Sequence, residues 1–221
     1  MKLAIFDLDG TLIAKDSDHA FGEFLVELGW ADGAAFKRTN DFFYQQYVAG
    51  TLDIDAYVEF ATRPWRDRTP AEQRDAVARF MADQMDPLIG EPARSLVRGH
   101  LDAGDRVVIA TSTNEFITRP IADAFGVATL VATQLERDAR GRVTGRIRGV
   151  PSLREGKVTR VQQWLQSEGL RLADFGASVF YSDSTNDLPL LELVSEPVAT
   201  NPSPALEAIA RERGWRILHL F

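Results

Sequence analysis

Residues 6–12 read FDLDGTL, and this stretch decides the fold because it closes a short apolar run that begins at Lys2. A short apolar run followed by polar residues and glycine is typical of a strand buried on both faces of a parallel sheet. Asp7 and Asp9 are two residues apart, so an extended chain places both carboxylates on one side. Gly10 then permits a sharp turn and leaves main-chain N–H groups free to meet an anion. We therefore expect two carboxylates at the carboxyl end of the first strand, where open α/β sheets bind ligands.

Four further runs resemble the first one, and helical patterns lie between them. The predicted strands are 2–6, 106–110, 129–133, 178–181 and 216–220, and the predicted helices are 93–101, 116–125, 157–166 and 188–194. Strands that alternate with helices indicate an α/β fold with a doubly wound parallel sheet. Residues 137–149 contain three glycines and predict a hairpin or flap.

The segment 16–86 has a different character and contains no strand-like run. Its apolar residues recur at helical spacing in 20–28, 36–48, 55–61 and 72–81, with breaks at Gly29, Gly50, Pro64 and Pro70. This pattern predicts a small helical bundle inserted after the first strand. We therefore expect an α/β core of residues 1–15 and 87–221 and a helical cap domain of residues 16–86. The aromatic residues expected in the core of this bundle are Phe21, Phe24, Phe42, Phe43, Tyr44, Tyr47 and Phe60.

The negative charge is concentrated in that same segment. The chain has a formal net charge of −7, and residues 16–86 contain 14 acidic and 7 basic side chains. The rest of the chain is therefore neutral overall. Such a distribution argues against binding to nucleic acid or to anionic lipid. It suits either a solvated helical surface or a site that attracts a substrate with a cationic group.

The composition also excludes several kinds of site. There is no cysteine, so disulfides, thiolate zinc sites and cysteine nucleophiles are excluded. No stretch approaches 18 uninterrupted apolar residues, and the apolar run at the N-terminus is too short for a signal peptide or a membrane span. We expect a soluble, cytoplasmic protein with no nucleic-acid or membrane partner, and the sequence does not indicate its oligomeric state.

The two carboxylates of Asp7 and Asp9 indicate a particular chemistry. One carboxylate can attack phosphorus while the other protonates the departing alcohol and later activates water. Two close carboxylates repel each other unless a cation holds them, and a hard dication such as Mg²⁺ prefers oxygen ligands. The pattern therefore predicts a magnesium-dependent reaction of a phosphate ester.

Polar residues also follow other predicted strands. Ser182-Asp183-Ser184-Thr185-Asn186-Asp187 comes directly after 178–181, and Thr111-Ser112-Thr113-Asn114 comes directly after 106–110. Lys157 opens a predicted helix after Gly156 and could neutralise a phosphoryl group. Because the carboxyl ends of parallel strands share one edge of a sheet, we expect these groups to converge.

These motifs carry a resemblance to a known family. FDLDGTL, ATSTN (110–114), Lys157 and YSDSTND (181–187) stand in the order of the four motifs of the haloacid dehalogenase superfamily, over nearly the whole chain. The position of the helical segment, between the first and second motifs, is similar to subclass IB, which contains phosphoserine phosphatase. The resemblance implies a Rossmann-like core, a helical cap and Mg²⁺-dependent phosphoryl transfer through an aspartyl-phosphate. Asp9 argues against the dehalogenase branch, which lacks this second aspartate and needs no metal.

Carried over position by position, the resemblance assigns roles to the motif residues. Asp7 would be the nucleophile, Asp9 the general acid/base, and Lys157 the cation that steadies nucleophile and phosphate. Mg²⁺ would be held by Asp7, by the main-chain carbonyl region of Leu8-Asp9, and by Asp183.

The remaining motif residues would serve the phosphate and the metal. Thr111 would hydrogen-bond the phosphoryl oxygens with the help of the Ser112 amide, and the Ser112 hydroxyl is the alternative phosphate ligand. Asn186 and Asp187 would orient the metal shell and Lys157. The relatives that act on phosphoserine usually have Ser-Gly-Gly at 111–113 and Gly-Asp-Gly at 182–184, so phosphoserine itself is left open.

Residues just after the first motif would face the leaving group of the substrate. Asp16 stands where relatives use a carboxylate to meet a substrate amine, and Asp18 adds a second negative charge nearby. They predict a small phosphate ester with an amine, such as phosphoserine or histidinol phosphate, the latter having no carboxylate. Alternatively, Asp16, Ser17 or Asp18 caps a helix that begins near His19, which is itself expected to be a packing or capping neighbour.

Two other functions compete with hydrolysis. A phosphotransferase or phosphomutase would use the same aspartyl-phosphate with an acceptor other than water. A non-catalytic ligand-binding protein could keep the fold, but it would have no need of two carboxylates that face a phosphate.

Overall fold

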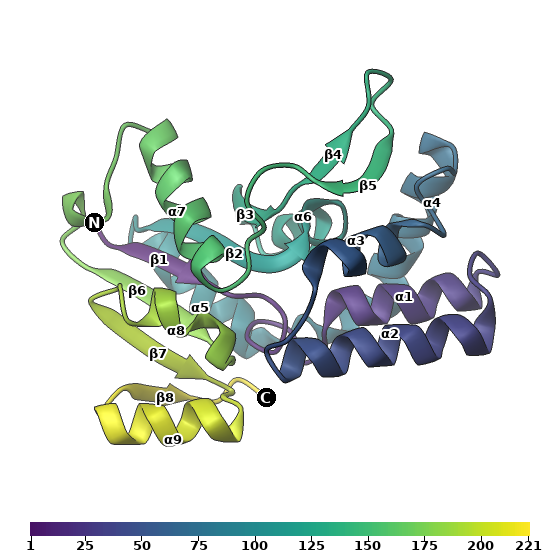
Figure 1. Ribbon diagram of the computed structural model, residues 1–221. Coiled ribbons are helices and arrows are strands. Elements are labelled where there is room, and N and C mark those ends of the chain that lie inside the picture. Colours follow the sequence, from purple (N-terminus) through teal and green to yellow (C-terminus); the bar gives the residue numbers. More distant parts are fainter.

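Six parallel strands form the sheet at the centre of the computed structural model, which describes residues 1–221 (Figure 1). The strand order is β3-β2-β1-β6-β7-β8, and every neighbouring pair is parallel. The strands are β1 (Leu3–Phe6), β2 (Arg106–Asn114), β3 (Thr129–Thr133), β6 (Ser178–Ser182), β7 (Glu196–Thr200) and β8 (Arg216–Leu218). The chain order reverses at β1, which lies between β2 and β6. The doubly wound α/β fold is thereby confirmed, and the ligand-binding edge of such a sheet lies at this reversal.

Helices cover both faces of the sheet because alternate residues of each strand point to opposite sides. Leu3 and Ile5 pack in one buried cluster, whereas Ala4 and Phe6 pack in the other. The first cluster includes α7, α8 and α9, and the second includes α5 and α6. The bounds of these helices are α5 (Glu91–Asp102), α6 (Glu115–Ala124), α7 (Glu155–Ser167), α8 (Leu188–Leu191) and α9 (Pro204–Arg213).

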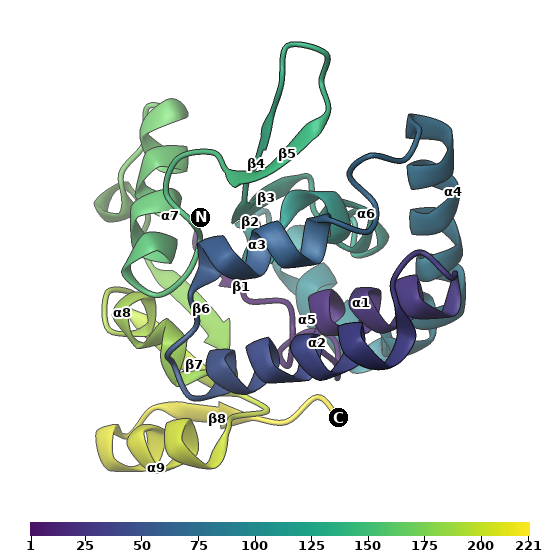
Figure 2. The same cartoon turned by 45° about the vertical axis from the view of Figure 1, so that its right-hand side comes forward.

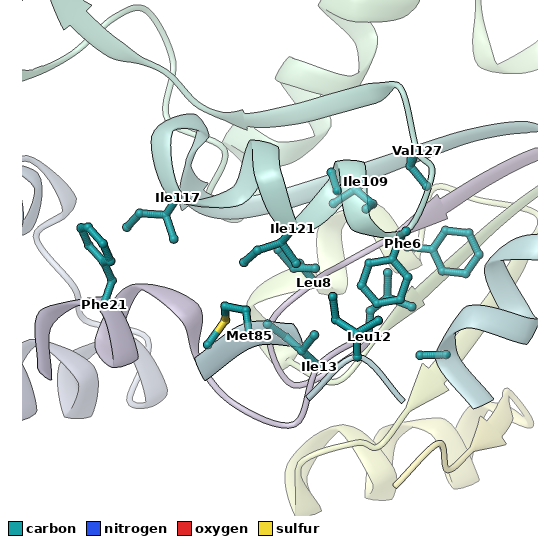
Figure 3. Close-up of a cluster of buried hydrophobic side chains, with 14 of the residues drawn as sticks. Phe6, Leu8, Leu12, Ile13, Phe21, Met85, Ile109, Ile117, Ile121 and Val127 are labelled. Carbon is teal, nitrogen blue, oxygen red and sulfur yellow. The ribbon is translucent and has the colours of Figure 1, made fainter. Parts of the chain in front are cut away.

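The loop after β1 is held rigidly by its own apolar residues. Leu8, Leu12 and Ile13 are completely buried, and Figure 3 shows them gathered with Ile121 and Met85. Fully burying an apolar side chain of this size contributes about 1.5–3 kcal/mol. Because Leu8 lies between the two aspartates and points into the core, the side chains of its neighbours are directed away from that core.

Residues 16–86 are helical, as predicted, and Figure 2 shows them on one side of the sheet. The helices are α1 (Ser17–Glu27), α2 (Gly33–Val48), α3 (Ile54–Thr62) and α4 (Pro70–Phe80), followed by a π-helical turn (Met81–Met85) and a 3₁₀ turn (Asp86–Leu88). Thr69 and Glu72 form a capping box at the start of α4, and Pro70 occupies its first turn. Division of the chain at residues 16 and 86 stays a prediction.

This inserted helical segment (residues 16–86) shares its core with the sheet. Phe21, Trp65 and Phe80 belong to the same buried cluster as Phe6, and the Trp65 ring stacks on Phe116 of α6 at 4.1 Å. The prediction that all its aromatics form a bundle core is wrong at several positions. Phe42 and Tyr44 are exposed by 55% and 41%, and the side chains of Phe43, Tyr44 and Tyr47 line a cavity. Helical periodicity locates an apolar face but does not say whether that face meets protein or ligand.

The predicted hairpin is present and rests on the inserted helical segment. β4 (Leu135–Arg137) pairs antiparallel with β5 (Val143–Ile147), and β5 lies against α3 (Figures 1 and 2). Gly145 in β5 has a φ of +88°, and the Glu59–Arg66 ion pair lies where its side chain would be. The hairpin is therefore a contact between the two parts of the chain.

Two elements escaped prediction, and one strand is longer than predicted. β7 begins with Glu196-Pro197 and α9 begins at Pro204 directly after Ser203, and neither shows a long apolar run or a strong periodic pattern. The sequence does carry two signals for the start of α9. Ser203 caps the helix with its side chain, and Pro204 stands in the first turn. β2 continues through Thr111–Asn114, with an irregular register against β3 over these residues. The polar residues expected directly after this strand are thus part of it.

None of the helices combines the length and the apolar character that crossing a membrane requires.

Candidate active site

The predicted motif residues meet at one edge of the sheet because β2, β1 and β6 are neighbours. Phe6 is in register with Ile109 on one side and with Tyr181 on the other. Asp7 thus leaves β1 beside the Thr111 end of β2 and the Asp183 end of β6. The sequence groups that we expected to converge do converge.

Lys157 is buried between two carboxylates. Its Nζ atom lies 2.9 Å from Asp7 Oδ1 and 2.7 Å from Asp187 Oδ1, and the Lys157 side chain is only 1% exposed. Ser182 Oγ donates a further hydrogen bond of 2.7 Å to Asp187 Oδ2. Burial alone would lower the pKa of Lys157, but the charges of Asp187 and Asp7 raise it above its ordinary value. Lys157 is therefore a permanent cation at this site.

Gly156 permits the close approach that puts Lys157 in place. A Cβ atom at Gly156 would lie 2.1 Å from the Pro151 carbonyl oxygen. Arg154, two residues earlier, adopts the uncommon φ of +54° for a non-glycine residue. The turn before α7 is thus tightly constrained where it delivers the lysine.

We predict that Gly156→Ala destabilises the protein by about 1–3 kcal/mol, as overpacking of a tight site does. The turn must shift to accommodate the methyl group, so catalytic turnover that uses Lys157 should fall as well. Urea unfolding and turnover measure the two effects. Gly99→Ala in α5 is the matched control, since nothing lies within 4 Å of its added methyl group. Equal stabilities of the two variants would contradict the prediction.

Asp7 carries a carboxylate whose ionisation is finely balanced. Burial raises its pKa to about 7, Lys157 acts in the opposite direction, and the charges of Asp187 and Asp9 raise it further. Thr11 Oγ1 lies 3.4 Å from Asp7 Oδ2 and 3.2 Å from Asp183 Oδ1. One hydroxyl thus touches both carboxylates, which shows that they lie close together.

Asp9 is held by two hydrogen bonds that keep its carboxylate fixed. Its Oδ1 accepts the Ser17 main-chain N–H at 2.7 Å, and its Oδ2 accepts the Thr113 hydroxyl at 2.9 Å. Burial raises the pKa of Asp9 to about 7, and the charge of Asp16 raises it further, against the hydrogen bonds from Ser17 and Thr113. A carboxyl group with this pKa can give and take a proton near neutral pH.

Thr113 was not predicted as a site residue. It stands two residues after Thr111 on the same extended strand, and this period-2 spacing is the signal that could have found it.

The two predicted phosphate ligands lie beside each other on β2. Thr111 is buried, and its Oγ1 accepts the Thr113 main-chain N–H at 3.2 Å. Ser112 is half-buried, and its carbonyl accepts the Thr133 hydroxyl at 2.7 Å. Both residues line the cavity next to Asp7. The choice between their hydroxyls stays open.

The carboxylates of Asp7 and Asp183 fit a hard metal ion. Burial raises the pKa of Asp183 well above its ordinary value, and the charges of Asp7 and Asp187 raise it further. A Cβ at Gly10 would lie 2.3 Å from Asp183 Oδ2, so the glycine allows this carboxylate to approach the loop. No group of three or more His, Cys, Asp or Glu side chains is arranged to hold a metal. Mg²⁺ is commonly held by one or two carboxylates together with water, and the prediction adds a main-chain oxygen of the loop after β1.

Asn186 and Asp187 occupy different positions. Asp187 contacts Lys157, as described above. The Asn186 amide donates to the Tyr47 carbonyl of α2 at 3.0 Å, and its oxygen accepts Arg154 Nε at 3.3 Å. Asn186 thus links the sheet edge to the inserted helical segment. Arg154 was not predicted, since a single loop arginine carries no distinguishing pattern.

A cavity opens beside Asp7 and Asp9 and encloses about 620 Å³, part of it open to solvent. Its walls come from the loop after β1, from α1, α2 and α3, and from β2. The lining residues outside the predicted motifs are Asn40, Phe43, Tyr44, Tyr47, Leu52, Ile54, Tyr57, Val58 and Thr133.

The three residues expected to meet the leaving group all line this cavity. Asp16 caps α1, since its Oδ1 accepts the His19 main-chain N–H at 2.7 Å. Asp18 is 9% exposed and lies in the first turn of α1. The His19 ring lies 5.1 Å from the Tyr44 ring, and its Nε2 is 2.8 Å from Asp41 Oδ1. The capping alternative for Asp16 is thus observed, while one of its oxygens is left for another partner.

Comparisons with known proteins agree on the family and on the fold. A family model described as haloacid dehalogenase-like hydrolase matches residues 4–192. A histidinol-phosphatase of Neisseria meningitidis is 48% identical over 98% of both chains. The crystal structure of a Bordetella pertussis protein of unknown function has a TM-score of 0.94 and 48% identity, and covers 100% of this chain and 99% of that one. A substrate-bound phosphoserine phosphatase shares the fold, with a TM-score of 0.68 at 16% identity and coverage of 98% and 92%.

Proposed function

The chain belongs to the haloacid dehalogenase-like hydrolases and is a phosphatase, and from that premise we propose that it hydrolyses a small, amine-bearing phosphate monoester through a phospho-Asp7 intermediate. The observation that supports this most is the Asp7–Lys157–Asp187 arrangement. A buried cation 2.9 Å from the Asp7 carboxylate favours its ionised form, and Asp7 lines the cavity. A purely structural ion pair would not need to face a cavity.

In the first step, an oxygen of Asp7 attacks phosphorus and the bond from phosphorus to the leaving alcohol breaks. Asp9 in its protonated form gives its proton to the leaving oxygen, which its raised pKa of about 7 allows. Lys157 offsets the charge of the phosphoryl group, and the Thr111 or Ser112 hydroxyl together with main-chain N–H groups bind the phosphoryl oxygens.

In the second step, water attacks the phosphorus of phospho-Asp7 and the Asp7–phosphate bond breaks. Asp9, now ionised, accepts the proton of the attacking water. The hydrogen bonds from Ser17 and Thr113 hold the Asp9 carboxylate in one position for both steps. The net reaction consumes one water and releases the alcohol and inorganic phosphate.

Mg²⁺ is the metal that the donor set suits. Asp7, Asp183 and the main-chain carbonyl of Asp9 would hold it, because oxygen donors are the ligands that this hard ion prefers. When bound, it would supply positive charge that lets the carboxylates accept an anionic phosphate. The side chain of Asp9 is already engaged by Ser17 and Thr113, which favours its main-chain oxygen as the ligand.

The substrate class rests on the cavity and on one relative. Asp16, Asp18 and His19 line the cavity, and the first two offer negative charge to an amine. The Neisseria meningitidis relative is named a histidinol-phosphatase, and histidinol phosphate is an ester of this class. We further propose that residues 16–86 act as a cap over the catalytic core of residues 1–15 and 87–221.

A direct assay tests the proposed function. The purified protein should release phosphate from p-nitrophenyl phosphate and from amine-bearing esters with Mg²⁺, and EDTA should abolish the activity until Mg²⁺ is restored. In the same assay, added alcohols should not replace water as the acceptor of the phosphoryl group. Undiminished turnover after exhaustive chelation would contradict the metal requirement, and transfer to the alcohols would indicate a phosphotransferase.

The raised pKa values also predict how Mg²⁺ binding depends on pH. The pKa of Asp7 is about 7 in the folded state against 3.8 for an ordinary aspartate, so this group favours the folded state while protonated. As pH rises from about 4 to 7, the buried Asp7 increasingly lowers the free energy of unfolding, because it ionises more readily in the unfolded chain. Bound Mg²⁺ should offset this loss of stability. We expect Mg²⁺ to raise the melting temperature more at about pH 8 than at about pH 5.

Thermal melts of two variants complete this test. Asp183→Asn removes one proposed ligand and should greatly reduce the stabilisation by Mg²⁺. Asp75→Asn, an exposed position on α4, should leave it unchanged. The same Mg²⁺ effect at both pH values, or in Asp183→Asn and wild type, would contradict the proposed ligand set.

A further inference from the structure

One carboxylate in the cavity has no partner in the chemistry described so far. Asp18 is nine-tenths buried and is hydrogen-bonded by the Tyr57 side chain but paired with no basic side chain, whereas Asp16 uses one oxygen to cap α1 and Asp9 uses both of its oxygens. A buried carboxylate without a cation is costly, and a fold tolerates it where a ligand completes it. The position of Asp18 on the cavity wall makes the substrate that ligand.

Aromatic side chains line the cavity together with Asp18, and one of them, Tyr57, hydrogen-bonds its carboxylate. Tyr57 of α3 and Phe43 of α2 pack edge to face with ring centroids 5.4 Å apart, and both line the cavity. Tyr44 and Tyr47 extend this wall along α2. Aromatic faces attract cations and add little charge of their own. The cavity therefore places the negative charge of Asp18 among aromatic side chains.

The charges around the cavity are one-sided. Four aspartates line it, while the lining contains no lysine and no arginine, and its single histidine is paired with Asp41. Among the cations outside this lining, Lys157 is paired with Asp7 and Asp187, and Arg154 donates to the neutral Asn186 amide oxygen. A carboxylate on the leaving group would thus meet a cavity lining that carries negative charge and no lysine or arginine.

We propose that Asp18, flanked by Tyr57, is the specificity-determining residue, and that it selects esters whose leaving alcohol carries a cation and no carboxylate. The proposal rests on the function proposed above and narrows its substrate class. It places the amine at Asp18 rather than at Asp16, whose capping bond and partial exposure suit a structural role.

The ionisation of Asp18 agrees with this assignment. Burial raises the pKa of Asp18 well above its ordinary value, and the charges of Asp16 and Asp9 raise it further, against a small lowering by Tyr57. A cationic group placed beside Asp18 would lower this pKa and favour the ionised carboxylate.

Three small esters that share one phosphoryl group separate the two parts of the proposal. O-phosphoethanolamine and O-phospho-L-serine differ only by the carboxylate, and n-propyl phosphate replaces the ammonium of phosphoethanolamine with a methyl group. We expect wild-type kcat/KM for phosphoethanolamine to exceed that for phosphoserine and that for propyl phosphate by about tenfold or more each. L-histidinol phosphate should follow phosphoethanolamine in this preference.

Variants then show which side chain causes the preference for a cationic leaving group. In Asp18→Asn, the ratio of kcat/KM for phosphoethanolamine to that for propyl phosphate should fall roughly 10- to 100-fold, the value of a hydrogen bond to a charged group. The ratio cancels any common effect on phosphoryl transfer. Tyr57→Phe should lower the ratio by a smaller factor. Asp55→Asn, which removes an exposed carboxylate from α3, should leave the ratio as in wild type.

Each alternative result has a distinct meaning. If wild type hydrolyses phosphoserine as well as phosphoethanolamine, or if Asp18→Asn keeps the wild-type ratio, the specificity proposal is overturned and the proposed function stands. The comparison of substrates in wild type needs no variant to fold. If no ester releases phosphate, p-nitrophenyl phosphate included, the proposed function falls and this inference with it.

Discussion

Asp7→Asn should abolish turnover, with a loss of roughly 10⁴-fold or more, as removal of a nucleophile does in enzymes with covalent intermediates. An amide of nearly the same shape cannot attack phosphorus, and it cannot accept the ion pair from Lys157 that holds Asp7 Oδ1 at 2.9 Å. Phosphate release in steady state measures the loss. Rapid acid quenching with labelled substrate should trap a phosphoprotein in wild type and none in Asp7→Asn.

Two controls make this result specific. Circular dichroism and thermal melting should show a folded variant, since asparagine preserves the volume of the side chain. Asp75→Asn should retain both turnover and the trapped phosphoprotein. Wild-type turnover in Asp7→Asn would remove the basis of the proposed mechanism.

Lys157→Met should have the largest expected effect on stability. It leaves Asp7 and Asp187 buried without their cation, and breaking a buried ion pair in this way costs about 3–5 kcal/mol. Turnover should fall about 10²- to 10³-fold as well, because a charge beside the phosphoryl group is lost. Urea unfolding at two pH values checks the reason for the effect. The loss should be smaller in acid, where the carboxylates can take up protons.

A matched lysine tests whether burial is the cause. Lys37→Met removes a comparable contact, since Lys37 Nζ lies 2.8 Å from Glu23 Oε1, but both side chains are largely exposed. Exposed pairs contribute about 0–1 kcal/mol, so this variant should unfold nearly as wild type does. Similar losses in both lysine variants would contradict the account of Lys157.

The fold could be predicted where strands are apolar throughout. The runs at 106–110, 129–133 and 178–181 lie within β2, β3 and β6, because a strand covered on both faces must be apolar along its length. β7 was not predicted because its first residues, Glu196 and Pro197, are not apolar strand formers and only its last three residues are buried. The helices of residues 16–86 were found from their periodicity.

The site could be predicted in its charged centre and not in its walls. Asp7, Lys157 and Asp183 follow strand ends or open a helix, so sheet topology alone brings them together. Tyr57 and Phe43 reach the cavity through the way α2 and α3 pack, which no local pattern encodes. The aromatic residues of α2 are spaced like those of a helix that faces a protein core. For this reason Phe43, Tyr44 and Tyr47 were predicted to be core residues, whereas they line the cavity.

The buried cluster that joins Phe21, Trp65 and Phe80 to Phe6 has a consequence for folding. Two regions that share one apolar interior lose their stability together, so heat or urea should unfold this chain in a single cooperative transition. Excising residues 16–86 would strip Phe116 and its neighbours of their cover and yield an aggregating remnant rather than a smaller enzyme. α2 differs from α1, α3 and α4 in contributing no side chain to this cluster, and the polar Asn186–Tyr47 bond joins it to the sheet edge.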